Sequence, residues 1–527
     1  MKKRLYTFIG LVPISMMVLP SCKKDFTAIN TDPNNSPAST PAQLLAPALV
    51  NTVTANMIRN RNFNNELMQV TVSLSDADAQ VFRYEYRRTY ADYLWNSWYV
   101  QLTNFKDIYT KAGEPLTANK SYQGIALICQ AWIYSMITDA YGDIPYSESN
   151  QAKSGITEPK FDTQKEIYLD LFKKLEEANT LLSTGPAVLA SSDPIYAGNV
   201  SKWRKFGNSL YLRMLLRLSG KAEVSSDMIA KIKEMVDTKA STYPKMTSND
   251  DSAILRWVGT GPYTNPYVTN VRTQDFTAPS IGSFFIDHLR DWQHPCLDIT
   301  KYGKGGVNRW GIAQGSNGFV GVPGGYLPGA GVAKQAYFYS SASTVSNALV
   351  TNLQVEPLDG MIMTYGELSF ILSEAALKGF ITTGTAENYY KTGILSTITT
   401  WLPIWPNLTA TTTPTTPATI TDAAFLTYLT DADIVWSPAG SVDDHMEQIH
   451  LQKYYTLFLE DLQQWVEFRR TGHPVLPKGA GLKNGGIMPA RLTYPVYVQS
   501  ANPTNYKKAV EVQGADEIYT QVWWQKP

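Results

Sequence analysis

Residues 139–148 read Asp139-Ala140-Tyr141-Gly142-Asp143-Ile144-Pro145-Tyr146-Ser147-Glu148, a stretch that ends a long apolar segment. Glycine is favoured just after a helix, and proline lacks the backbone N–H that a continuing helix needs. Upstream of this stop, side chains recur at helical spacing: Tyr122, Ile125, Cys129, Ile133, Met136 and Ile137. We therefore predict a mostly buried helix that ends near residue 141, in a mainly α-helical protein.

Helical spacing continues on both sides of this segment. A stripe from Tyr86 to Ile108 stops near Gly113 and Pro115, and the capping stretch 162–164 precedes a stripe over 167–182. Helices of this length, joined by moderate loops, favour antiparallel pairs that stack on one another. Further helices are predicted at 203–218, 363–378, 387–400, 422–430 and 443–470, the last ended by Gly472 and Pro474.

Two long segments lack helical spacing, residues 240–350 and 401–421. Eleven of the 29 residues from Gly303 to Gly331 are glycine, so this part cannot be helical throughout. Loops this long within a compact domain are usually functional or disordered. Because residues 240–350 are also rich in aromatic side chains, we expect ordered, functional loops there.

The N-terminus has the form of a lipoprotein signal peptide. Three basic residues, 2–4, precede fifteen uncharged ones, which as a helix would reach only about 22 Å against roughly 30 Å of hydrocarbon. The run ends in Leu19-Pro20-Ser21-Cys22, which resembles a bacterial lipobox. We predict a signal peptide over 1–21, lipidation of Cys22, and a flexible tether over 22–40 that anchors the protein to the membrane without spanning it.

The charge balance and the spacing of possible metal ligands argue against nucleic acid and metal ions as partners. Without residues 1–21, 43 Lys and Arg stand against 46 Asp and Glu, and this near-neutral balance argues against nucleic acid. The histidines at 288, 294, 445, 450 and 473 lack zinc-protease spacing, and the two remaining cysteines, Cys129 and Cys296, form no metal-binding motif. We predict no metal and no cofactor, and the spacing leaves open whether the two cysteines pair.

Motifs for catalysis are missing from the sequence. The glycines of 303–306 are not followed by phosphate-loop residues, and no Gly-x-Ser-x-Gly motif occurs. The acidic pairs 250–251 and 443–444 could hydrolyse a glycoside only if their side chains faced each other across a sugar. We therefore predict a binding protein and no enzyme. A surface lipoprotein glycoside hydrolase and a helical-repeat interaction scaffold remain as alternatives.

The stretch 139–148 resembles the helix-ending signature of SusD/RagB nutrient-binding lipoproteins, in particular the SusD-like branch. Other similar blocks follow in the same order as in that family, at residues 28–34, 161–164, 200–210, 363–368, 374–376, 465–472 and 489–495. The resemblance implies one domain over 41–527, with tetratricopeptide-like helix pairs in a right-handed superhelical scaffold, long irregular loops and few short strands.

The same resemblance implies a function and a location. Such a protein would bind an oligosaccharide or another nutrient and deliver it to a SusC-like TonB-dependent transporter. It would be lipid-anchored in the cell outer membrane and exposed at the surface. Which nutrient it takes is not fixed by the sequence.

A sugar site needs flat aromatic rings for apolar C–H faces and planar polar groups for hydroxyls. The densest candidate cluster runs from Phe82 into the predicted helix over 86–108, where aromatic side chains alternate with Arg and Asn. Its position resembles the glycan-contact region of the family. We predict ligand-binding residues at positions of this cluster that lie off the helical stripe, namely Phe82, Tyr84, Trp95 and Asn96. From the later loops we add Trp257, Tyr263, Trp310 and Tyr326.

Overall fold

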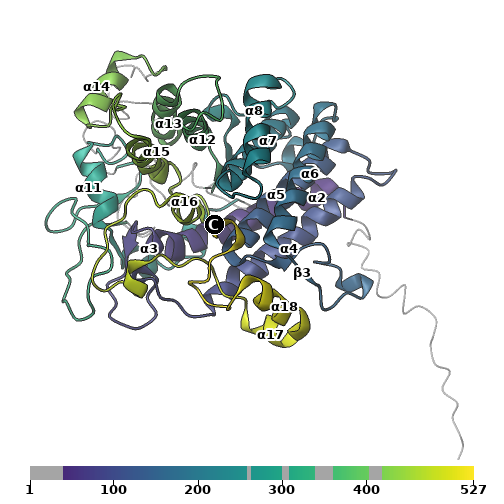
Figure 1. Cartoon of the computed structure of the whole chain (residues 1–527), viewed down its shortest axis with the longest axis horizontal. Helices are drawn as coiled ribbons and strands as arrows, with labels where there is room; N and C mark the ends of the chain where they lie inside the picture. Colours follow the sequence, from purple (N-terminus) through teal and green to yellow (C-terminus); the bar gives the residue numbers. More distant parts are fainter. Residues whose placement is uncertain (1–38, 258–262, 299–307, 339–359, 403–417, 527) are drawn as a thin grey trace, which may run out of the picture. The chain divides into compact units, whose positions relative to one another are not determined.

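The computed structural model describes residues 39–257, 263–298, 308–338, 360–402 and 418–526 (Figure 1). Residues 40–527 form one compact unit. The predicted signal peptide and Cys22 lie outside the described residues, as does the tether up to residue 38. No helix within the described ranges combines the length and the apolar character of a membrane span.

Helices make up most of the secondary structure of this unit, as predicted. Their bounds are α2 Pro41–Arg59, α3 Asn65–Leu67, α4 Tyr90–Lys111, α5 Lys120–Tyr141, α6 Gln164–Ser183, α7 Val200–Leu218, α8 Ser225–Lys233, α9 Pro266–Thr269, α10 Thr273–Thr277, α11 Ser283–Asp291, α12 Tyr365–Leu377, α13 Ala386–Trp401, α14 Ala423–Asp431, α15 Val442–Thr456, α16 Gln463–Thr471, α17 Val496–Ala501 and α18 Pro503–Gln513.

Helices adjacent in sequence pack against each other as antiparallel pairs. A Cβ at Gly124, near the start of α5, would meet Leu182 near the end of α6, while Tyr168 near the start of α6 donates to Asp139 near the end of α5. Figure 1 shows α4, α5, α6 and α7 as neighbours, with α12, α13 and α15 grouped together. The predicted mainly α fold of stacked helix pairs is confirmed.

Short antiparallel ladders join the segments between helices. The two strands of each pair are separated in sequence by at least one loop. The pairs are β1 Thr71–Val72 with β5 Ser280–Ile281, β2 Ile144–Pro145 with β3 Phe161–Asp162, β4 Ala253–Leu255 with β8 Gly360–Met363, and β6 Ile312–Ala313 with β7 Tyr337–Phe338. The described parts of the long segment 240–350 are thus ordered and largely irregular, as expected from their glycine content.

The end of α5 carries the stretch 139–148. Gly142 terminates the helix with φ 85° and ψ −126°, a combination open to glycine alone. Its amide donates to Thr138, and the next residue, Asp143, uses its carboxylate to accept from the amide of Gln164 at the start of α6. The predicted capping stretch is a capping box in which Thr163 and Glu166 satisfy each other's backbone amides.

The prediction of a single helix over 443–470 is wrong. Two helices, α15 and α16, flank a break at 457–462, where Leu459 and Asp461 adopt positive φ. The Asp461 carboxylate accepts from the backbone amide of Leu462, and Glu460 turns inward to pair with Arg213. The break therefore places an acidic side chain in the core that a continuous helix would direct elsewhere.

Both described cysteines, Cys129 and Cys296, are buried and free. Burial raises the pKa of each thiol well above its ordinary value. These thiols are therefore protonated and unreactive at neutral pH.

Candidate ligand-binding site

An aromatic groove lies where α4, the loop after α5 and α17 meet. We use this name for the cavity of about 240 Å³ lined by Trp95, Tyr99, Pro145, Ser149, Asn150, Thr157, Pro159, Tyr497, Val498, Ala501 and Asn502. Helix α4 contributes the first two, and α17 contributes Tyr497 and Val498. Because the stretch 139–148 ends α5 and turns the chain back, it brings Pro145 against α4 at this point.

Trp95 forms the floor of the aromatic groove and Tyr497 its rim. The Trp95 ring packs edge-on against Tyr141 and Tyr494, with centroids 5.0 and 6.0 Å away, and lies 4.9 Å from Tyr99. Trp95 is only 6% exposed, whereas Tyr497 is 45% exposed. These edge-on and tilted ring contacts hold the floor in place, and the exposed rim tyrosine supplies a flat apolar face.

Hydrogen bonds within the protein fix the polar groups around the groove. The Tyr497 hydroxyl donates to Asn96 Oδ1 over 2.5 Å, and Asn150 Nδ2 donates to the carbonyl of Tyr99 over 2.8 Å. Asn96 lies behind the rim and is not part of the groove lining. Among the described residues, Asn96 Nδ2 and Asn150 Oδ1 have no hydrogen-bond partner, so an amide NH2 group and an amide oxygen remain for a ligand. None of the described residues lining the groove is charged. The groove therefore suits an uncharged ligand with both apolar faces and hydroxyl or amide groups.

Two of the predicted aromatic residues meet elsewhere, far apart in sequence. Phe82 and Tyr326 stack with their centroids 5.3 Å apart, and Arg83 lies over both rings, at 4.5 and 4.8 Å. Arg83 Nε also donates to the Tyr326 carbonyl over 3.1 Å. Phe82 is fully buried and Tyr326 half-buried. This cluster fastens the loop of Tyr326 to the segment before α4.

Other predicted ligand residues lie in the core. Trp257 and Trp310 are each 1% exposed and Tyr84 is 2% exposed, so no face of these rings is accessible to a ligand in this structure. Trp310 stacks on His294 with centroids 5.5 Å apart, and burial raises the pKa of Tyr84 to about 12. Tyr263 is half-buried against the same core. The expectation that aromatic residues in irregular segments face a ligand is corrected for these buried rings.

Tyr497 was missed by sequence reasoning. Its partner Asn96 lies 401 residues away in the chain, and no local pattern marks α17 as part of a site. Of the predicted ligand residues, Trp95 forms the floor of the groove and Asn96 accepts from the rim tyrosine, so both stay candidates for ligand binding.

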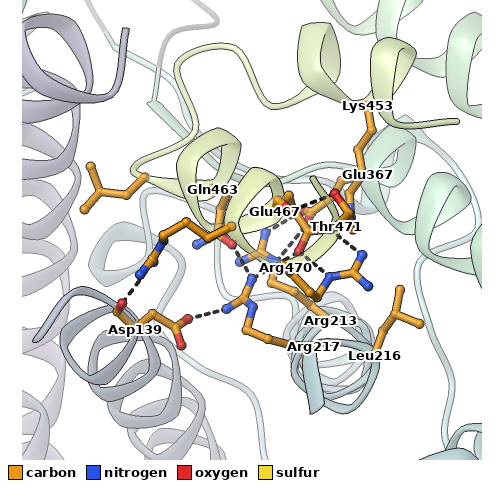
Figure 2. A network of polar contacts seen from close by, with 12 residues as sticks. Asp139, Arg213, Leu216, Arg217, Glu367, Lys453, Gln463, Glu467, Arg470 and Thr471 are labelled. Atoms are coloured by element: carbon orange, nitrogen blue, oxygen red, sulfur yellow. Dashed lines mark hydrogen bonds and ion pairs between the residues drawn. The ribbon is translucent and has the colours of Figure 1, made fainter. Parts of the chain in front are cut away.

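Carboxylates cluster at a second place, a buried ion-pair network between α5, α7, α12, α15 and α16 (Figure 2). Arg217 pairs with Asp139, and its other terminal nitrogen donates to Gln463 over 2.7 Å. Arg213 Nε donates to Glu367 over 2.7 Å, and the same guanidinium pairs with Glu460. All these charged side chains are at most 2% exposed, which closes them to any substrate.

Part of this network has the spacing of a metal site. One ligand atom each from Glu374, His450 and Glu467 lies within 4.8 Å of the others. Arg470 donates to Glu374 over 2.8 Å and contacts Glu467 over 2.8 Å, and Lys453 donates to Glu467 over 2.7 Å. Burial opposes ionisation of Glu374, but its pairing with Arg470 holds its pKa well below the usual value. Because these cations already neutralise both carboxylates, the group is an ion-pair network, and it does not favour a metal ion.

Comparisons with known proteins extend this description. A family profile described as "Starch-binding associating with outer membrane" matches residues 33–495. The chain belongs to the SusD-like family. A comparison with curated proteins found no match.

Solved structures of SusD homologues share the fold of this SusD-like protein. Two from Bacteroides fragilis are 22% and 20% identical, with TM-scores of 0.73 and 0.72, and each comparison covers 93% of this chain and 100% of the other. A chitin-binding SusD homologue from Flavobacterium johnsoniae is 18% identical with a TM-score of 0.65, over 90% of this chain and 98% of the other. The family expected from the stretch 139–148 and its companion blocks is thereby confirmed.

Proposed function

We propose that this SusD-like protein binds an uncharged oligosaccharide in the aromatic groove and delivers it to a SusC-like TonB-dependent transporter. The observation that carries the proposal is the exposed Tyr497 ring above the Trp95 floor, with the amides of Asn96 and Asn150 beside it. Sugars offer apolar C–H faces to rings and hydroxyls to amides, so the groove matches both. The description of the family, starch-binding, and the name of one solved relative, chitin-binding, support a glycan as the nutrient.

Binding to a ring of this exposure is expected to be weak enough for release. Covering about 100 Å² of ring and sugar face at about 25 cal/mol per Å² gives roughly 2.5 kcal/mol before the costs of association. One such contact plus two hydrogen bonds yields modest affinity, which suits a protein that passes its ligand on.

Tyr497→Ala is expected to weaken oligosaccharide binding at least tenfold and up to about sixtyfold, because it removes the rim ring and the hydroxyl that orients Asn96. Isothermal titration with maltohexaose and chitohexaose measures the change. Tyr389→Ala on α13, which removes a half-buried tyrosine outside the groove, is the matched control and should bind as the native protein does. If neither sugar binds the native protein, or if both variants bind equally well, the groove is not the site.

The location rests on Cys22, which we propose is acylated and holds the protein on the outer membrane. Cys22→Ala should move the protein from the outer-membrane fraction to the soluble fraction and abolish incorporation of labelled palmitate, since two or three buried acyl chains supply the anchor. Cys129→Ala, which changes a buried cysteine, is the control and should stay anchored. A membrane-bound Cys22→Ala protein contradicts the anchor. Delivery to a transporter requires a complex with one. If no TonB-dependent barrel copurifies with the native protein, the proposed delivery to a SusC-like transporter is contradicted.

A further inference from the structure

A second cavity has a different chemistry from the aromatic groove. We call it the cationic cavity: it holds about 620 Å³ between the end of α16, residues 478–490 and the C-terminal segment 519–526. Its volume falls in the range of about 300–1,000 Å³ typical of ligand sites. Three segments of the chain build it, so its walls are set by the tertiary fold and not by one flexible loop.

Positive charge predominates in the lining of this cavity, and the nearest acidic groups, Asp139 and Asp143, lie behind the lining. Arg469, Lys478 and Lys526 line it, and none of its described lining residues is Asp or Glu. Arg469 donates to the backbone carbonyls of Ala490 and Asp139, and Lys526 Nζ donates to the carbonyl of Gln513 over 2.7 Å. Backbone carbonyls orient these cations but do not neutralise them. Lys478, the third cation of the cavity, is exposed to solvent.

Arg469 is held in place by aromatic rings. Its guanidinium carbon lies 3.8 Å from the centroid of Trp465 and 5.1 Å from that of Trp524. Its Nε is buried and has no hydrogen-bond partner among the described residues. Burial lowers the pKa of Arg469 to about 9, so it stays charged at neutral pH. The Asp139 carboxylate acts on Arg469 electrostatically, but it pairs with Arg217. Among the described residues no carboxylate accepts a hydrogen bond from Arg469, so this fixed cation is prepared for an anion from outside.

The remaining walls favour a ligand larger than an inorganic ion. Asn484, Gln521 and Gln525 present side-chain amides around the cavity, and Tyr519 contributes a ring. Amides suit hydroxyl groups, and a single water occupies only about 30 Å³. We propose that the cationic cavity binds an anionic saccharide through its carboxylate or sulfate groups. This inference does not depend on the aromatic groove, whose described walls are uncharged.

Titration of the full chain with trigalacturonate and with a heparin tetrasaccharide tests the proposal. At least one of them should bind, and tenfold more salt should weaken that binding. If trigalacturonate is the ligand, its fully methyl-esterified form, which lacks the charge, should bind at least tenfold more weakly. Inorganic sulfate is the third probe. If it binds as tightly as the better saccharide, the saccharide part of the proposal is overturned.

Lys478 is the residue to change, because it is exposed and its removal should not disturb the core. Lys478→Gln should weaken the anionic saccharide about threefold and Lys478→Glu about tenfold. Lys508→Glu on α18 makes the same charge change at an exposed position outside the cavity and should have no effect. Tyr497→Ala should also leave this binding intact, which separates the two sites. Equal affinity of the native and Lys478→Glu proteins, or no binding of either saccharide, overturns the proposal.

Discussion

Gly142→Ala is expected to lower the free energy of unfolding by about 4 kcal/mol. The backbone angles of Gly142 are closed to other residues, which costs about 1–3 kcal/mol. A Cβ at this position would also lie 1.7 Å from Gln513 Oε1. Gln513 is buried, accepts from the amide of Asp143 over 2.7 Å and donates to the carbonyl of Tyr141 over 3.2 Å. Displacing it loses two buried hydrogen bonds at about 1 kcal/mol each.

Denaturant unfolding measures this loss, and Gly155→Ala is the matched control. Gly155 also has a positive φ, 89°, but its ψ of 1° lies in the left-handed helical region that other residues can adopt, and no atom lies within 4 Å of its added Cβ. Its variant should therefore lose only about 1 kcal/mol, the cost of the backbone conformation. Similar losses in the two variants would show that neither the ψ of Gly142 nor its contact with Gln513 adds to the cost of a positive φ.

Arg213→Met should destabilise the protein by about 3–5 kcal/mol at pH 8, because it leaves Glu367 and Glu460 buried without their shared cation. Burial, together with the neighbouring Glu367, already raises the pKa of Glu460 well above its ordinary value. Without Arg213 this pKa rises further, so the folded variant takes up a proton that the unfolded chain releases at neutral pH. A raised carboxyl pKa gives stability at low pH that is lost as the pH rises.

The deficit of Arg213→Met relative to the native protein should thus shrink from pH 8 to pH 5, as measured by urea unfolding at each pH. The triple variant Arg213→Met, Glu367→Gln, Glu460→Gln removes the charges together and should recover most of the stability. A deficit that does not change with pH, with no recovery in the triple variant, would mean that lost packing and not uncompensated charge is responsible.

Apolar spacing and capping residues predicted the helices whose bounds are set by neighbouring residues in the sequence. Helix α5 follows from its apolar spacing and its Gly142 stop, and α6 from its capping box. The break between α15 and α16 could not be predicted, because Glu460 is drawn inward by Arg213, which lies 247 residues earlier. The apolar spacing over 443–470 is that of one continuous helix, and it gives no information about contacts with a residue as distant as Arg213.

The candidate site was predictable to a similar extent. Trp95 and Asn96 lie off the apolar stripe of α4, and the groove includes them or their contacts. Trp310 looked equally available in sequence, yet its ring packs 5.1 Å from Phe458 and 5.7 Å from Trp401. Aromatic residues in irregular segments can cover a ligand or cover one another, and composition does not distinguish the two.

The pairing of α7 with the C-terminal part of the chain also sets an order of events during synthesis. Arg213 and Arg217 are made long before Glu460 and Gln463 exist, with 247 and 246 positions between the partners. Until those late residues arrive, enclosing α7 would bury cations whose counter-charges are incomplete. The native interior can therefore close only when nearly the whole polypeptide is present. Such a chain is expected to remain incompletely folded for most of its synthesis.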